Sequence, residues 1–282
     1  MKFDLNIGFV NNMPDAALEA TERQFVTLLN EAAENDITVR LTFYTLPMVP
    51  RTNLGLQYLS SYRDLDDLWG ESLDGLIVTG TEPRAKNLKD EPYWAGLARL
   101  LDWAEQNTLS AIWSCLAAHA AVLHLDGIQR CRLSQKRFGI FEFVPDGRHF
   151  LNAGAPERLG VPHSRWNDLR EDELKAAGYE ILTRSEEAGV DAFQKQGRSL
   201  FVFLQGHPEY DAETLLLEYR RDAKRFLRGE SEVAPSLPNG YSDPLRAVPN
   251  TWHAPALGLY RNWLSYLAAQ KACALQPLAI GA

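Results

Sequence analysis

One cysteine lies where the sequence predicts a buried strand to end and a helix to begin. The apolar run 110–114 is typical of a short buried strand, and the Ala-rich segment 116–121 has a high helix propensity. Cys115 would therefore project from the end of a sheet, beside the unpaired N–H groups of a helix N-terminus, which favour the nucleophilic thiolate. Most unpaired cysteines are simply small buried hydrophobic residues, so Cys115 alone does not establish catalysis.

A histidine and a glutamate two residues apart follow a second apolar strand, predicted over residues 199–204. In extended backbone, His207 and Glu209 would point to the same face, where the carboxylate could orient the imidazole and stabilise its protonated form. A loop histidine beside a surface acid is the more common meaning of such a pair. Together with Cys115 at the same sheet edge, however, the two residues would complete a set of nucleophile, base and orienting group, which favours catalysis.

The elements that must position these residues alternate between strand and helix in the first half of the chain. Strands are predicted over residues 3–10, 39–46, 74–80 and 110–114. Amphipathic helices are predicted around residues 21–32 and 93–105. This alternation is typical of a mostly parallel sheet flanked by helices, where ligands bind at the carboxyl ends of the strands. We therefore expect the loops after Val10 and Val78 to converge on Cys115.

The second half of the chain has shorter predicted elements. Antiparallel strands are expected within residues 181–204, and helices over residues 211–228 and 260–269. The basic segment 130–137 and the polar segment 162–165 are typical of solvated loops. We expect a single α/β domain over residues 1–282.

Composition excludes several classes of function. The net charge of -8 argues against a nucleic-acid-binding surface. The three cysteines, Cys115, Cys131 and Cys273, form neither a disulfide framework nor a metal-binding spacing, which fits a reducing cytoplasm. The N-terminus lacks the apolar core of a signal peptide, and the longest apolar stretch, residues 109–125, is too short and too polar for a membrane span.

Several motifs, in order along nearly the whole chain, together resemble the MetA family of homoserine O-acyltransferases. They are Asn12-Met13-Pro14, Thr21-Glu22, Gln24-Phe25, Leu73 to Gly80, Tyr93-Trp94, Phe138-Gly139, Pro162 to Arg165, Gly206 to Asp211, Glu218 to Asp222 and Asn262-Trp263-Leu264. The resemblance implies a fold similar to class I glutamine amidotransferases, of flavodoxin-like type. It also implies transfer of an acyl group from acyl-CoA, a co-substrate, to the hydroxyl of L-homoserine in methionine biosynthesis, with no further cofactor and no metal.

The resemblance assigns roles to the three catalytic candidates. Cys115 would carry the acyl group as a thioester, His207 would be the general base and Glu209 would orient it. Backbone N–H groups beside Cys115 and near Thr79-Gly80 would stabilise the oxyanion. Because both half-reactions would use one site, ping-pong kinetics are expected.

Substrate-binding residues also follow from the resemblance. Arg221 would bind the carboxylate of the amino-acid acceptor, and Lys136 and Ser164 would line the same site. Arg84 corresponds to the position that distinguishes succinyl from acetyl donors, and a cation there suits the second carboxylate of a succinyl group. The resemblance further implies a homodimer.

The sequence departs from the family pattern at three places. The segment 15–18 has no lysine after Met13-Pro14, His119 replaces a glutamine, and the segment 252–255 reads Trp-His-Ala-Pro in place of Trp-Arg-Ser-His. These departures leave alternatives open: transfer to another hydroxy amino acid, glutaminase-type amide hydrolysis with the same three residues, or a non-catalytic binding homologue.

Overall fold

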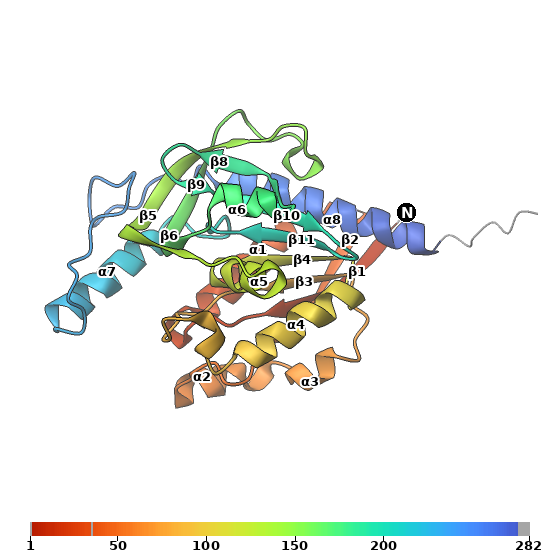
Figure 1. Ribbon diagram of the computed structural model, residues 1–282, viewed down its shortest axis with the longest axis horizontal. Helices are drawn as coiled ribbons and strands as arrows, with labels where there is room; N and C mark the ends of the chain where they lie inside the picture. The colour runs from red at the N-terminus through yellow and green to blue at the C-terminus, as the bar shows by residue number, and fades with distance from the viewer. Residues whose placement is uncertain (1, 35, 276–282) are drawn as a thin grey trace, which may run out of the picture.

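A computed structural model describes residues 2–34 and 36–275 of the chain (Figure 1). Its centre is a seven-stranded sheet with the order β2-β1-β3-β4-β11-β10-β7. The strands are β1 (Phe3–Val10), β2 (Ile37–Tyr44), β3 (Gly75–Val78), β4 (Ser110–Ser114), β7 (Glu180–Ile181), β10 (Ala192–Gln196) and β11 (Leu200–Leu204). The first five strands in this order are parallel, and β10 and β7 pair antiparallel at one edge. The predicted α/β fold is confirmed.

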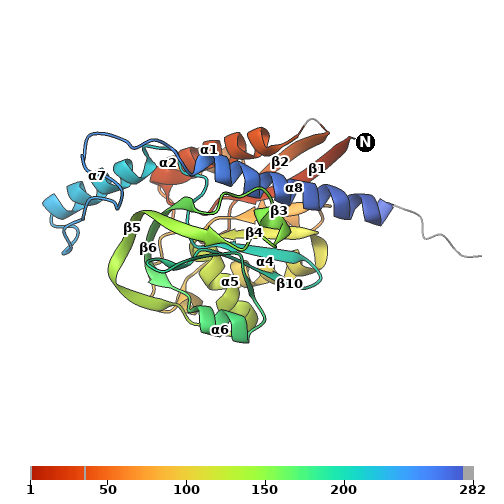
Figure 2. The ribbon, with the colours of Figure 1, turned by 90° about the horizontal axis from the view of Figure 1, so that it is seen from above.

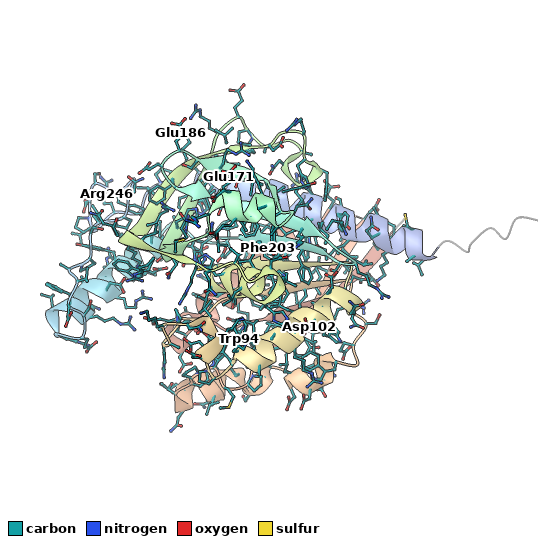
Figure 3. The ribbon with its side chains drawn as sticks, viewed as in Figure 1. Trp94, Asp102, Glu171, Glu186, Phe203 and Arg246 are labelled. Carbon is teal, nitrogen blue, oxygen red and sulfur yellow. The ribbon has the colours of Figure 1, made fainter. Side chains whose placement is uncertain are left out.

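Helices cover both faces of the sheet (Figure 2). One face packs against α3 (Leu65–Leu68), α4 (Trp94–Asn107) and α5 (Leu116–Asp126). The other face packs against α1 (Leu18–Ala32) and α8 (His253–Leu275). Both faces of the parallel strands are therefore buried, which explains why β3 and β4 read as continuous apolar runs. Phe203 of β11 lies in the middle of the molecule, whereas Glu186 and Arg246 lie at its periphery (Figure 3).

A second sheet of four strands, with the order β6-β5-β8-β9, packs beside the first. Its strands are β5 (Cys131–Pro145), β6 (Leu159–Asp168), β8 (Thr183–Ser185) and β9 (Gly189–Val190). The remaining helices are α2 (Asn53–Tyr58), α6 (Glu171–Ala176) and α7 (Thr214–Leu227), with short 3₁₀ turns at Asp15–Ala17, Leu59–Ser61, Leu88–Asp90 and Phe150–Asn152. The single domain expected over residues 1–282 stays a prediction.

Two sequence-based expectations were wrong in this second half, whereas the antiparallel strands expected within residues 181–204 are confirmed. The basic segment 130–137 is not a loop but the first half of β5, and the segment 162–165 lies inside β6. These segments pair with each other, with Arg137 opposite Arg165 and Phe138 opposite Ser164, so their polar side chains belong to a sheet. The strand ending at Leu204 is antiparallel to β10 but parallel to β4, which places its carboxyl end at the same edge as that of β4.

The register brings four strand ends together. Val10 pairs with Val78, Val78 pairs with Trp113, and Ser114 pairs with Leu204. The loops after β1, β3, β4 and β11 therefore begin within one residue of each other at one edge of the sheet, as predicted for the first three.

Candidate active site

Cys115 occupies a strained turn between β4 and α5. Its backbone has φ 54° and ψ -115°, a left-handed conformation that side chains other than glycine seldom adopt. The Cys115 N–H donates to the carbonyl of Leu204 at 2.7 Å, and its own carbonyl accepts from Ala118 N at 3.0 Å in the first turn of α5. These bonds hold the turn, and the thiol is half-buried at the end of the sheet.

His207 and Glu209 form a buried pair in the turn after β11. The Nδ1 atom of His207 lies 2.8 Å from Oε1 of Glu209, and both side chains are at most 5% exposed. The predicted contact is confirmed, but its backbone is a turn, not an extended segment: Tyr210 N donates to the carbonyl of His207 at 3.2 Å. A hydrogen bond of 2.8 Å from His207 N to the carbonyl of Pro162 ties this turn to β6.

The charge state of His207 follows from its neighbours. Burial alone would lower the pKa of His207, but the negative charges of Cys115 and Glu209, with hydrogen bonds to both, raise it well above its ordinary value. Cys115 and Glu209 therefore both favour the protonated form of the His207 imidazole. The three residues separated in sequence meet at one sheet edge.

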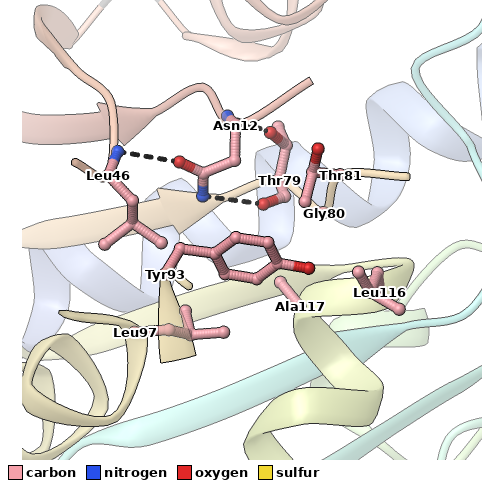
Figure 4. A pocket seen from close by; sticks show the side chains of 9 residues that line it. All are labelled: Asn12, Leu46, Thr79, Gly80, Thr81, Tyr93, Leu97, Leu116 and Ala117. Atoms are coloured by element: carbon pink, nitrogen blue, oxygen red, sulfur yellow. Dashed lines mark hydrogen bonds between the residues drawn. The ribbon is translucent and has the colours of Figure 1, made fainter. Parts of the chain in front are cut away.

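Two backbone segments approach each other closely beside Cys115. A Cβ atom on Gly80 would lie 2.7 Å from the backbone nitrogen of Leu116, so only glycine permits this approach. Asn12 fixes the Gly80 loop: its N–H donates to Thr79 Oγ1 at 2.8 Å and its Nδ2 to the carbonyl of Thr79 at 3.0 Å (Figure 4). The loop after β3 therefore lies directly against the first residue of α5, and the oxyanion role expected for the N–H groups here stays a prediction.

The predicted substrate-binding residues gather around two acids of α7. Ser164 Oγ donates to Glu218 Oε2 at 2.5 Å, and Lys136 Nζ lies 3.0 Å from Asp222 Oδ2. Arg221 Nη2 lies 2.9 Å from Asp222 Oδ1. The structure thus brings Lys136, Ser164 and Arg221 together, although their binding roles stay predictions.

Tyr210 connects this cluster to the catalytic candidates. Its ring stacks on the His207 imidazole, with centroids 4.3 Å apart and an angle of 15° between the planes. Its hydroxyl donates to Glu218 Oε1 at 2.6 Å. The indole of Trp252 donates to the carbonyl of Tyr210 at 2.7 Å. The segment 252–255, which differs from the family pattern, therefore helps to hold Tyr210 in place.

A buried polar network supports the His207 turn from below. Asp191 Oδ1 accepts from Gly206 N at 2.7 Å and lies 3.5 Å from His163 Nε2. Arg165 Nε donates to His163 Nδ1 at 3.1 Å, so neutral His163 carries its proton on Nε2, facing Asp191. Burial raises the pKa of Asp191 to about 6 and lowers the pKa of His163 well below its usual value.

His119, which replaces the family glutamine, joins the same network. Its Nε2 lies 2.8 Å from Oε1 of Gln205, the residue that follows β11. Burial lowers the pKa of His119 to about 3, so the ring is neutral. The side chain thus links α5, which follows Cys115, to the segment that leads to His207.

Two further positions singled out in the sequence lie in the segments that follow β3 and β1. The Arg84 side chain is exposed in the loop after β3, where the N–H groups of Arg84 and Ala85 both donate to Glu91 Oε1 at 2.6 Å. Asp15, found where the family has a lysine nearby, accepts from Thr52 N at 2.7 Å and lies 3.3 Å from Arg51 Nη1. Asp15 therefore ties the loop after β1 to the segment that contains Thr52 and the buried side chain of Arg51.

Sequence reasoning did not assign roles to several residues of this site. Glu218 and Tyr210 were part of recognised motifs, but nothing in their spacing indicates that the hydroxyl of Tyr210, in the turn before α7, donates to Glu218 within the helix. Asp191 and Gln205 gave no signal, because their partners are distant in the chain. These two residues are recognised as part of the site by their burial, which depends on tertiary packing and is not visible in the sequence.

Comparisons with known proteins agree with this architecture. The sequence profile of the family described as homoserine O-succinyltransferase matches residues 3–274. Homoserine O-succinyltransferase of Rhodopseudomonas palustris is 48% identical, over 94% of this chain and 89% of the relative. The enzyme of the same name from Bradyrhizobium japonicum is 46% identical, over 94% of this chain and 90% of the relative.

Solved structures show the fold. A glutamine amidotransferase from Methylobacillus flagellatus superposes with a TM-score of 0.60 at 16% identity, over 94% of this chain and 96% of that one. The glutamine amidotransferase TM1158 from Thermotoga maritima superposes with a TM-score of 0.56 at 14% identity, over 93% of this chain and 97% of that one. The class I glutamine amidotransferase-like fold is thus confirmed, and with the family profile spanning nearly the whole chain, this protein belongs to the homoserine O-succinyltransferase family.

Proposed function

We propose that this protein transfers a succinyl group from succinyl-CoA to the hydroxyl of L-homoserine through a thioester on Cys115, a step of methionine biosynthesis. The observation that carries the proposal is the meeting of Cys115, His207 and Glu209 at the carboxyl edge of the sheet. The names of the relatives, which cover nearly the whole chain, support the choice of acyl group and acceptor.

The first half-reaction acylates Cys115. The thiolate attacks the thioester carbonyl of the donor, and the N–H groups of Gly80 and Leu116 stabilise the oxyanion. The CoA sulfur leaves with the proton of the His207 imidazolium, which gives free CoA and an acylated cysteine. The raised pKa of His207 suits this step because the ring begins protonated.

The second half-reaction passes the acyl group to the acceptor. Neutral His207 takes the proton of the homoserine hydroxyl, whose oxygen attacks the thioester on Cys115. Collapse of the intermediate releases the ester and restores the thiolate beside the imidazolium. Glu209 keeps the Nδ1 proton of His207 in place, so that Nε2 performs the proton transfers in both directions.

Acceptor recognition follows from the cluster on α7. Arg221 is the candidate partner of the homoserine carboxylate, with Lys136 and Ser164 lining the site. The neighbouring acids, Glu218 and Asp222, suit the ammonium group of an amino acid. This arrangement of both charges beside Tyr210 and His207 favours a zwitterionic acceptor.

The donor and the setting are also proposals. Arg84 is exposed in the loop beside the site, and its charge suits the free carboxylate of a succinyl group better than an acetyl group. Faster acylation by acetyl-CoA than by succinyl-CoA would contradict this preference. We propose acyl-CoA as a co-substrate and no resident cofactor.

Within the described residues 2–34 and 36–275, none of the helices combines the length and apolar character needed to cross a bilayer. Separately, we propose a cytoplasmic location, which suits the acyltransferase activity that the relatives are named for. A homodimer is our proposed assembly, and light scattering on the eluted protein checks it.

Mass spectrometry of the intact protein tests the function. After mixing with succinyl-CoA at neutral pH, we expect one succinyl group on Cys115, which disappears when homoserine is added and O-succinylhomoserine forms. Cys115→Ala should show no adduct, whereas Cys273→Ala, which removes an exposed cysteine, should react normally.

Three other outcomes would contradict the proposal. Absence of any adduct at neutral pH would indicate a non-catalytic homologue. Faster transfer to a different hydroxy amino acid would change the acceptor, and release of glutamate from glutamine without any acyl donor would indicate amide hydrolysis.

A further inference from the structure

One face of α7 carries a continuous row of cations. Arg220, Arg221, Lys224, Arg225 and Arg228 recur at spacings of three and four residues, which places them on one side of the helix. Together with Leu217 and Glu230 they line an open groove of about 450 Å³. Glu230 is the one acid among these lining residues.

This row works against the stability of the helix. Like charges four residues apart, as in Arg220–Lys224, Arg221–Arg225 and Lys224–Arg228, destabilise a helix. Arg221 is paired with Asp222 at 2.9 Å, but further along the row the compensation is weak. Arg225 lies 3.5 Å from Glu82, and Arg228 lies 4.0 Å from Glu230, with arginine side chains 43% and 71% exposed. A concentration of positive charge in a chain of net charge -8 points to a ligand that carries negative charge.

The groove begins at the active site and runs away from it. Arg221 belongs to the cluster beside Tyr210, and Arg228 lies two helical turns further on, about 10 Å along the axis. Arg225 faces Glu82 in the loop after β3, the loop that also carries Gly80 and Arg84. In Figures 1 and 2, α7 extends outward from the side of the molecule where the parallel strands end.

We propose that this face of α7 binds the phosphate groups of the acyl donor, a nucleotide with a 3′-phosphate and a 5′-diphosphate. The inference rests on the proposed function, since it assumes a CoA thioester as donor. Arginine side chains bind phosphate oxygens through paired N–H donors, and several anionic groups would relieve the repulsion within the row. The flexible arm of the donor would then extend from the groove past Arg221 to Cys115.

The test compares two donors on one variant. The triple substitution Lys224→Ala, Arg225→Ala and Arg228→Ala leaves out Arg221, which is assigned to the acceptor, and Arg220, which donates to the carbonyl of Pro244. We expect the KM for succinyl-CoA to rise about 10-fold or more, with kcat changed less than about 2-fold. For succinyl-pantetheine, which has no phosphate, both constants should stay unchanged.

A matched control removes the same charge elsewhere. Arg148, Arg170 and Arg198 are exposed and lie on other elements, so their replacement by alanine should leave the KM for succinyl-CoA unchanged. Alanine favours helix at positions 224 and 225, and Arg228 is the residue that follows the last turn of α7, so the unfolding midpoint of the test variant should equal or exceed that of the wild type. An unchanged KM for succinyl-CoA in a folded triple variant would overturn the inference.

Calorimetry with adenosine 3′,5′-bisphosphate separates this inference from the proposed function. Binding by the wild type that is lost in the triple variant and kept in the control supports the phosphate site, even if Cys115 is never acylated. Conversely, acylation of Cys115 by succinyl-pantetheine, together with equal bisphosphate binding by the wild type and the triple variant, keeps the function and rejects the site.

Discussion

The ring of Tyr210 lies flat against the imidazole of His207, with the two centroids 4.3 Å apart. Its hydroxyl reaches Glu218, which in turn accepts from Ser164. One side chain therefore contacts both the proposed base and the proposed acceptor site, and the two contacts can be separated by substitution.

Tyr210→Phe and Tyr210→Ala should affect different kinetic constants. Phenylalanine keeps the stack but removes the hydrogen bond to Glu218, so we expect a higher KM for homoserine with kcat within about 3-fold of the wild type. Alanine also removes the stack, and kcat should fall about 10-fold because the His207 ring loses a packing partner. Steady-state kinetics measure both constants, and an equal loss of kcat in both variants would contradict this division.

The strained turn at Cys115 predicts an unusual order of stabilities. A non-glycine residue at φ 54° and ψ -115° stores about 1 to 3 kcal/mol, which glycine does not. Glycine normally loses about 0.4 to 1 kcal/mol to alanine through the entropy of the unfolded chain. Cys115→Gly should therefore be more stable than Cys115→Ala by about 1 kcal/mol, measured by chemical denaturation. Both variants should be inactive, and a less stable glycine variant would show that the turn is unstrained.

Pattern reasoning located the catalytic candidates because their positions depend on local signals. The apolar run before Cys115 and the strand before His207 are visible in the sequence, and the rule for parallel sheets places both at one edge. The error at residues 162–165 has a different origin. Their polar side chains read as a loop, but β5 lies opposite them and Arg165 is neutralised by Asp168 at 2.6 Å. The pairing of β5 with β6 depends on the tertiary structure, so the local sequence of residues 162–165 could not indicate it.

The acceptor cluster could be named from the family motifs but not assembled from them. Lys136 lies on β5, Ser164 on β6 and Arg221 on α7, and the acids of α7 bring them together. No periodicity specifies which strand faces which helix across so many intervening residues. The backbone of the His207–Glu209 turn was missed for a similar reason, because spacing alone does not distinguish a turn from a strand.

Gly80→Ala should impair acylation selectively. The added Cβ would lie 2.6 Å from the Cβ of Leu116 and 2.7 Å from its nitrogen, so the two N–H donors must move apart. Loss of one oxyanion donor lowers the rate by a factor on the order of 10² to 10³. The acylation rate is measured by quenching the reaction at set times and determining the Cys115 adduct by mass spectrometry. Gly147→Ala is the control because an added Cβ meets nothing within 4 Å there. Normal acylation in the Gly80 variant would exclude the proposed donor pair.

The protonation state of His207 gives the last prediction. Burial lowers the pKa of His207, and Cys115 and Glu209 outweigh it, so Glu209→Gln and Cys115→Ala should each move the titration of this ring to lower pH. Labelled-histidine NMR measures the shift, with Glu187→Gln, an exposed acid, as control.

The same linkage fixes the sign for stability. Because the pKa of His207 is higher in the folded than in the unfolded chain, its interaction with Glu209 stabilises the fold fully below about pH 6.5, and this contribution is lost as the pH rises through the folded pKa. The difference in unfolding free energy between wild type and Glu209→Gln should therefore shrink at high pH.

The kcat of the Glu209→Gln variant should fall by a factor on the order of 10² to 10⁴, because the imidazole of His207 loses its orienting carboxylate. An unshifted His207 titration in Glu209→Gln would mean that Glu209 only packs against the ring.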